Sequence, residues 1–156
     1  MRLVESAKLI WAAEPKNYTG AAMTAKYVSL KNYAHLTILI STGAWAGGTA
    51  AVTLSQATDV AGTSAKALGL SNQWNDITTS GTLVKTAVAA DTFTLGTANK
   101  LFVIEIEAHE LDMANDFDCL TLAVASPGAN ADFYQVDYVL SEPRYASDTP
   151  PSALVD

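Results

Sequence analysis

Cysteine, basic residues and charge in general are scarce in this sequence. Cys119 is the single cysteine among 156 residues, which excludes an intramolecular disulfide. Nine Lys and Arg residues, scattered along the chain, stand against sixteen Asp and Glu residues, and the net charge is −7. Because a nucleic-acid surface needs clustered basic side chains that neutralise phosphates, this composition argues against a nucleic-acid partner.

Long apolar runs are missing as well. The longest uncharged stretches are rich in Thr, Ser and Gly, and none reaches the ~18 apolar residues that a membrane helix requires. The start, MRLVESAKLIWAAEP, carries a charge within its apolar part and lacks the usual cleavage site of a signal peptide. We therefore expect no membrane partner and a product made in the cytoplasm.

Charged residues make up only 16% of the chain, against roughly 25% in ordinary domains. A surface with so little charge favours a subunit that packs against other proteins. The single cysteine opens an apolar stretch, and this position favours a small buried side chain over a reactive thiol at Cys119.

Alternation of apolar and polar residues is what the sequence has in abundance. Between Leu101 and Arg144, three alternating segments are separated by Gly, Pro, Asn and Asp. Their apolar positions are Phe102, Ile104 and Ile106, then Leu120, Leu122 and Val124, then Tyr134, Val136, Tyr138 and Leu140. Because successive side chains of a strand leave opposite faces, each segment predicts an antiparallel strand with one solvated face.

Further strands are predicted at residues 25–30, 35–42, 50–57, 65–74, 82–88 and 92–95. The glycines of 43–48 predict a hairpin loop, and 110–115 is the one helical candidate, of a turn or two at most. Eight or nine strands about ten residues apart predict an all-β fold, an antiparallel β-sandwich of jelly-roll type. We expect an N-terminal arm with one strand at 1–24, the β-sandwich domain at 25–146 and an extended C-terminal tail at 147–156.

Residues that could carry catalysis are few. His35 and His109 are the only histidines, the usual bases near neutral pH, and neither lies in a recognisable catalytic frame. Gly43, Gly47 and Gly48 are not followed by the Gly-Lys-Ser/Thr of a phosphate loop. We therefore predict no catalytic residue, no cofactor and a non-enzymatic protein.

Carboxylates gather at Glu110, Asp112, Asp116 and Asp118, beside His109. Clustered oxygens can hold Ca²⁺, but this spacing departs from an EF-hand, which needs alternating ligands, a central Gly and a bidentate Glu. One His with carboxylates is also a poor ligand set for a transition metal. Solvated loop carboxylates are the simpler interpretation, with calcium as the alternative, and no metal site is predicted.

Trp11, Trp45 and Trp74 are candidates for contacts. Trp74 ends an apolar stretch and is predicted to lie in the core. Trp45 lies in the glycine-rich loop and is predicted to be exposed, and an exposed Trp usually marks a contact. A partner protein is favoured as that contact, and a sugar-stacking platform is the alternative.

Five segments carry a resemblance to a known family. They are 27–33 (YVSLKNY), 56–60 (QATDV), 110–112 (ELD), 117–119 (FDC) and 144–146 (RYA). Over most of its length the chain resembles small structural proteins encoded in the head-gene region of tailed bacteriophages, which look like capsid decoration, or cement, proteins. The resemblance implies a β-rich homotrimer on the capsid surface of the virion that clamps neighbouring copies of the major capsid protein. No catalytic residue carries over.

Candidate partner contacts follow from apolar or extended character in segments rich in turn residues. They are Leu9, Ile10 and Trp11 in the arm, Trp45 in the loop, and Arg144, Tyr145, Pro150, Pro151 and Leu154 near the C-terminus. Packing of the same residues onto the protein's own sheet is the alternative. Two other functions stay open: another virion part, either a tail-tube or a head-completion protein, and a carbohydrate-binding jelly-roll module.

Overall fold

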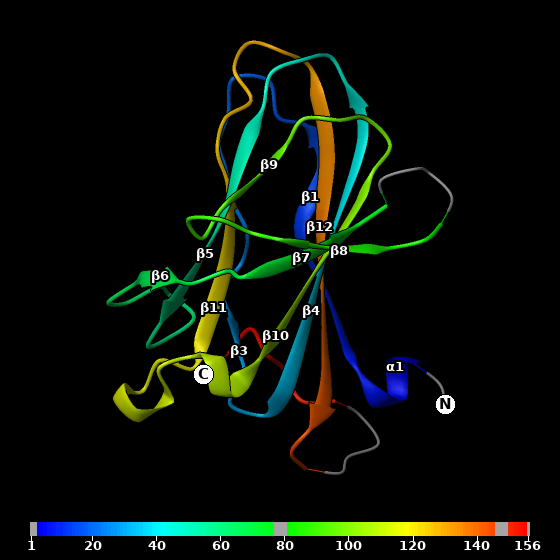
Figure 1. The fold of residues 1–156 in the computed structure, drawn as a ribbon. Helices are drawn as coiled ribbons and strands as arrows, with labels where there is room; N and C mark the ends of the chain where they lie inside the picture. The colour runs from blue at the N-terminus through cyan, green and yellow to red at the C-terminus, as the bar shows by residue number, and fades with distance from the viewer. Residues whose placement is uncertain (1–2, 77–80, 146–149, 156) are drawn as a thin grey trace.

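Two antiparallel sheets face each other in the computed structural model, which describes residues 3–76, 81–145 and 150–155 (Figure 1). Sheet A has the strand order β1 (Lys8–Asn17), β12 (Asp132–Pro143), β4 (Tyr33–Trp45), β10 (Leu101–Glu107), β7 (Asn72–Asn75) and β8 (Val84–Ala87). Sheet B has the order β2 (Met23–Thr24), β11 (Cys119–Val124), β5 (Ala50–Ala57) and β6 (Lys66–Leu68). In addition, β3 (Val28–Ser29) pairs with β11, and β9 (Phe93–Leu95) pairs with β5.

Helical structure is confined to one turn of α-helix, α1 (Leu3–Ser6), and two 3₁₀ turns, η1 (Ala108–Glu110) and η2 (Met113–Asn115), within the described residues. The helical candidate at 110–115, a turn or two at most, appears as these two 3₁₀ turns, and Leu111 and Asp112 have non-helical backbone angles between them. None of the helices within the described residues has the length and apolar character needed to cross a membrane.

The chain passes from one sheet to the other between most of its long strands. Strands β1, β4, β10 and β12 belong to sheet A, whereas β2, β5 and β11, which alternate with them along the chain, belong to sheet B. The first strand thereby lies beside the last, β1 next to β12, and β2 lies next to β11. This connectivity is that of a jelly roll, so the predicted all-β, antiparallel jelly-roll sandwich is confirmed.

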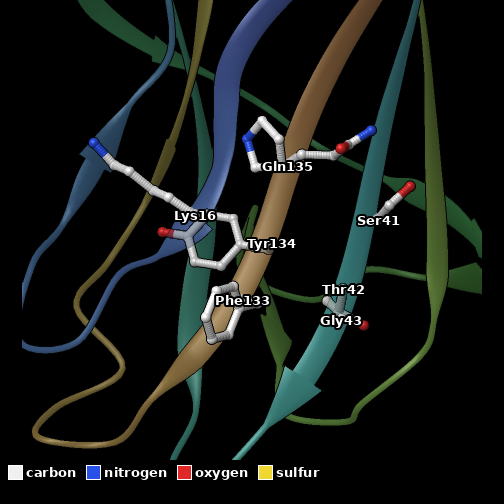
Figure 2. Close-up of a pocket in the computed structure, with 8 residues that line it drawn as sticks. Lys16, Ser41, Thr42, Gly43, Phe133, Tyr134 and Gln135 are labelled. Carbon is white, nitrogen blue, oxygen red and sulfur yellow. The ribbon is translucent and has the colours of Figure 1, made fainter.

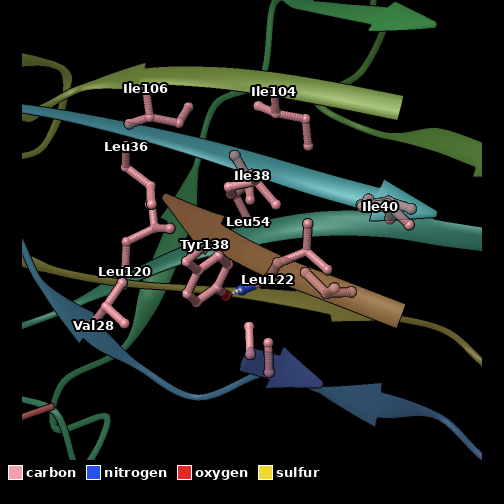
Figure 3. Close-up of a cluster of buried hydrophobic side chains, with 14 of the residues drawn as sticks. Val28, Leu36, Ile38, Ile40, Leu54, Ile104, Ile106, Leu120, Leu122 and Tyr138 are labelled. Carbon is pink, nitrogen blue, oxygen red and sulfur yellow. Dashed lines mark hydrogen bonds between the residues drawn. The ribbon is translucent and has the colours of Figure 1, made fainter. Parts of the chain in front are cut away.

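Every second residue of the long strands builds the core between the sheets. In β4, Leu36, Ile38 and Ile40 are fully buried, while the intervening Thr37 and Leu39 are half-buried on the other face. Figure 3 shows side chains of β4, β10 and β12 meeting those of β5 and β11. Each such burial stabilises the fold by roughly 1.5–3 kcal/mol, so the period-two pattern supplies the main driving force for folding.

Strand β11 differs from the pattern predicted for it. Cys119 and Thr121, which share the face opposite to Leu120 and Leu122, are buried as well, and the Thr121 hydroxyl donates to the Ala25 carbonyl at 2.7 Å. The predicted solvated face of this strand is therefore wrong. The expectation of a buried Cys119 is confirmed.

One hydrogen bond crosses the core from sheet A to sheet B. The Leu122 N–H donates to the Tyr138 hydroxyl at 3.0 Å, drawn as a dashed line in Figure 3, while the Leu122 carbonyl accepts from the Ala25 N–H at 2.8 Å. Tyr138 is fully buried, and this burial raises the pKa of its hydroxyl far above the ordinary value. The neutral hydroxyl thus satisfies a backbone donor of β11 that lies between the residues paired with β2 and those paired with β3.

The hairpin loop predicted at 43–48 is wrong: residues 43–45 continue β4, and the connection that follows spans residues 46–49. It carries the chain from β4 in sheet A to β5 in sheet B, because β12 and β10 occupy both edges of β4. The Asp132 carboxylate accepts the N–H groups of Ala46 at 2.6 Å and Gly47 at 3.3 Å, which holds this crossing in place. Gly48 has a φ of +78°, and a Cβ there would lie 2.5 Å from the Pro127 carbonyl oxygen.

The single strand predicted at 65–74 is also wrong. Residues 66–68 form β6 in sheet B and residues 72–75 form β7 in sheet A, so the chain changes sheets between them. Within β7 the buried side chain is Gln73, and Trp74 is half-buried on the opposite face with the Lys85 amino group 5.3 Å from its ring centre. The predicted core position of Trp74 is therefore wrong as well.

Both ends of the chain pack on the sandwich. The strand expected in the arm is β1, an edge strand of sheet A that pairs with β12. Near the C-terminus, the Ala153 carbonyl accepts the Ser29 N–H at 2.9 Å, and the Tyr33 hydroxyl donates to the Pro151 carbonyl. Residues 146–149 and 156 lie outside the described residues, so the division into arm, domain and tail stays a prediction.

Candidate interaction surface

The face of sheet A that points away from sheet B, called the outer face below, carries a row of large side chains. Strand pairing aligns Trp11 with Asp137, Asp137 with Leu39, Leu39 with Val103, and Val103 with Trp74. Because paired residues of neighbouring strands project to the same side, these five side chains cross the sheet from β1 to β7. Four of the five are apolar or aromatic, which is unusual for the outside of a sandwich.

A shallow groove of about 370 Å³ lies over the β1 end of this row. Its outer lining includes Leu9, Trp11, Leu39, Asp137 and Val139. Trp11 is 56% exposed and Leu9 is 47% exposed, although both lie within strand β1. Asp137 accepts a hydrogen bond from the Gln135 side chain at 2.8 Å, so the one carboxylate in the groove is held by its own strand.

A second depression, of about 230 Å³, lies toward the other end of β12 (Figure 2). Strand β1 shifts register against β12 between Ala13 and Lys16, and the depression lies beside this irregularity. Phe133 is exposed at the edge of this depression. Gly43 lies opposite, and a Cβ atom placed on Gly43 would lie 3.4 Å from the Phe133 Cβ. The two depressions lie on the same outer face, and the hydrogen-bonded pair Gln135 and Asp137 separates them along β12.

A polar cluster joins three strands on the same face. The His35 Nε2 lies 2.6 Å from the Glu105 carboxylate, and its Nδ1 lies 3.1 Å from the Ser141 hydroxyl. The Thr37 hydroxyl donates to the same Glu105 oxygen at 3.0 Å. These side chains bind one another across β12, β4 and β10, which supports a structural role for His35.

The acidic cluster is engaged by its own chain. Asp112 forms an ion pair with Lys66 and accepts from the Asn115 amide at 2.9 Å, and the Lys66 hydrogen bond is the main cause that lowers the Asp112 pKa. Glu110 accepts the Glu107 N–H at 2.8 Å. Among the described residues, no three His, Cys, Asp or Glu side chains are grouped so that they could hold a metal ion.

The structure separates the contact residues predicted from the sequence. Leu9 and Trp11 lie together on the outer face, whereas Ile10 points into the core. Trp45 is half-buried: its indole donates to the Gly48 carbonyl at 3.1 Å and its ring centre lies 6.3 Å from that of Tyr134. The predicted free exposure of Trp45 is therefore wrong.

Toward the C-terminus, Arg144, Tyr145 and Leu154 are exposed, Pro151 is half-buried and Pro150 is buried. Sequence reasoning missed the outer-face residues Leu39, Val139 and Phe133. The signal was present, because Leu39 and Val139 are apolar at positions where the alternation of a half-solvated strand calls for polar residues.

Truncation tests whether the C-terminal segment belongs to the fold. Removing residues 150–156 should lower the free energy of unfolding by about 1–3 kcal/mol, because the Ser29 N–H loses its acceptor and the buried Ala153 is lost. Removing only residues 154–156 is the matched control and should change it by less than about 0.5 kcal/mol, since Leu154 and Val155 are exposed. Urea unfolding measures both, and equal stabilities would contradict the docking.

No protein-family model and no curated protein matches the chain. Among solved structures it is similar to the SPBc2 prophage-derived protein YomS, at 11% identity and a TM-score of 0.46 over 87% of this chain and 93% of that one. It is also similar to the Tobacco streak virus coat protein, at 9% identity and a TM-score of 0.30 over 97% and 94% of the two chains. The N-terminal cellulose-binding domain of Cellulomonas fimi β-1,4-glucanase C has 12% identity and a TM-score of 0.28 over 90% and 80%. Likenesses this weak say nothing about function.

Proposed function

We propose that the protein is a non-enzymatic structural subunit of a tailed-bacteriophage virion, which decorates the capsid by binding the lattice of the major capsid protein as a homotrimer. The observation that carries the proposal is the outer face of sheet A, where the large apolar side chains of Leu9, Trp11 and Phe133 are exposed on strands β1 and β12. Large apolar side chains exposed on one face are typical of a protein contact. The resemblance of the sequence to phage head-region proteins supports the choice of partner.

Two physical properties suit this role. Many copies on one shell add their contacts through multivalency, so each interface can be weak. The acidic chain, with a net charge of −7, is repelled by nucleic acid and would stay on the outside of a shell that holds DNA. The virion surface is therefore the proposed location of the assembled protein.

The Trp11→Asp variant tests the outer face directly. It should reduce cosedimentation with preformed shells of the major capsid protein by more than about tenfold, because an exposed Trp in an apolar groove is a typical hot spot and an added carboxylate opposes burial. Met113→Asp, at an exposed apolar residue of η2, is the matched control and should bind as the parent does. Thermal melting checks that both variants fold. Equal binding by the two variants, or no binding by the parent chain, would overturn the proposal.

The proposed oligomer has its own test. A decoration protein of this kind should have the mass of three chains in solution and bind preformed shells, whereas a tail-tube protein should form rings of sixfold symmetry. Native mass spectrometry distinguishes these states. A hexameric ring would replace the capsid proposal with the tail-tube alternative.

A further inference from the structure

A cleft of about 580 Å³ is lined by residues of β7, β9 and β10 and of the loop between β9 and β10. Figure 1 labels these three strands. The lining residues are Gln73 and Asn75 of β7, Phe93 and Thr94 of β9, Thr97 and Lys100 of the following loop, and Phe102 of β10. Its volume falls within the roughly 300–1,000 Å³ of small-molecule sites. The size therefore admits a ligand larger than a few waters.

The cleft lies on the inner side of β7, away from the outer face. Asn75 pairs with Phe102, whose side chain joins the core cluster, so Asn75 and Gln73 point inward while Trp74 points outward. The cleft is therefore a surface separate from the apolar row proposed to contact the capsid.

The Gln73 amide is the feature that calls for a ligand. This side chain lines the cleft, is only 5% exposed, and its Oε1 finds no hydrogen-bond donor among the described residues. Buried polar atoms are nearly always paired, and leaving one unpaired costs stability. A ligand with an O–H or N–H group could supply the missing donor after a small movement of the amide.

Two aromatic rings form the apolar wall of the same cleft. The ring centres of Phe93 and Phe102 lie 5.6 Å apart, and Phe93 is only partly buried against the core. The electron-rich face of an aromatic ring attracts the polarised C–H groups of a sugar ring. Around this wall, Thr94, Thr97 and Asn75 carry groups that both donate and accept hydrogen bonds.

The charge of the lining narrows the ligand class. The described residues that line the cleft include no carboxylate and a single cation, Lys100, which suits neither a metal ion nor a polyphosphate. Amides, hydroxyls and an aromatic wall match a neutral ring that carries hydroxyl groups on its edge and C–H groups on its faces.

We propose that the cleft between β7, β9 and β10 binds a neutral saccharide, with a sugar hydroxyl donating to Gln73 and a ring face packed against Phe93. This function goes beyond capsid decoration and does not depend on it, because the two surfaces lie on opposite sides of β7. The proposed sugar site therefore differs from the sugar-stacking platform considered at Trp45, whose indole N–H donates to the Gly48 carbonyl.

The test titrates the full-length protein with neutral oligosaccharides of glucose, mannose, galactose and N-acetylglucosamine. At least one should bind with a Kd of about 1 mM or tighter by calorimetry. Gln73→Met, which keeps the side-chain length and removes the amide, should weaken that binding about tenfold or more. Phe93→Leu, which keeps apolar bulk and removes the ring face, should weaken it similarly and serves as a second variant if Gln73→Met fails to fold.

Trp74→Ala is the matched control, because Trp74 lies on the opposite face of the same strand. It should leave saccharide binding unchanged. The proposal is overturned if no oligosaccharide in the panel binds, or if Gln73→Met and Phe93→Leu both bind as the parent does. It is also overturned if Trp74→Ala alone abolishes binding, or if unstructured peptides occupy the cleft in place of the sugars. Capsid cosedimentation of Gln73→Met and Phe93→Leu should be unaffected, so failure here leaves the decoration proposal standing.

Discussion

Replacement of Ile38 by alanine is expected to lower the free energy of unfolding by about 2–5 kcal/mol. Ile38 is fully buried in the middle of β4, and Figure 3 shows it between the side chains of the two sheets. Truncation removes apolar contacts and leaves a cavity that the packed strands around it cannot collapse to fill. Urea unfolding monitored by tryptophan fluorescence measures the loss.

Leu39→Ala is the matched control, one residue further along the same strand. Leu39 is half-buried on the outer face, so its truncation should cost less than about 1 kcal/mol. The comparison is sensitive to register, because a slip of one residue moves every side chain of a strand to the other face. A larger loss for Leu39→Ala than for Ile38→Ala would show that β4 is turned inside out relative to the structure.

The Tyr138→Phe variant should lose about 1–3 kcal/mol of stability. Its hydroxyl is the acceptor for the Leu122 N–H at 3.0 Å, and both groups are buried between the sheets. Phenylalanine keeps the ring in the core but leaves that backbone donor without an acceptor, so the cost is the desolvation of an unpaired N–H.

Tyr134 offers the matched control on the same strand. It is also buried, but its hydroxyl finds no hydrogen-bond partner among the described residues, and its ring stacks on Tyr18 with the centres 4.2 Å apart. Tyr134→Phe keeps the stacking and removes an unpaired polar atom, so stability should stay within about 0.5 kcal/mol or rise. Equal losses in the two variants would mean that the Tyr138 hydroxyl does not connect the sheets.

The alternation of apolar and polar residues was enough to predict several of the long strands, because it does not depend on which neighbouring strand each one pairs with. The alternation at 101–107 and 134–140 appears as β10 and β12, and the strand predicted at 50–57 coincides with β5. Period-two alternation is a property of consecutive residues, and a half-buried strand keeps it wherever it pairs. The all-β class followed from the same repeated signal.

Pairing over long distances decided what local pattern could not. The glycines of 43–48 are compatible with a hairpin, but β10 and β12, from much later in the chain, take both edges of β4. The stretch 65–74 is apolar enough for one strand, yet its two halves join different sheets, and this places Gln73 rather than Trp74 inside. Turn residues show where a chain bends, but they do not show which strand the next segment pairs with.

The same division applies to the candidate surfaces. The apolar residues of the N-terminal segment predicted Leu9 and Trp11 as candidate contacts from the sequence alone. Only the assembled sheets place these two residues on one face with Leu39 and Phe133. The same holds for Gln73 and Phe93, which line one cleft although they come from different sheets. Sequence by itself determined the β class and the inward side of most long strands, because alternation between neighbours suffices for both. Only the tertiary structure decided which strands adjoin and which side chains from distant segments share a surface, because those depend on hydrogen-bond partners far apart in the chain.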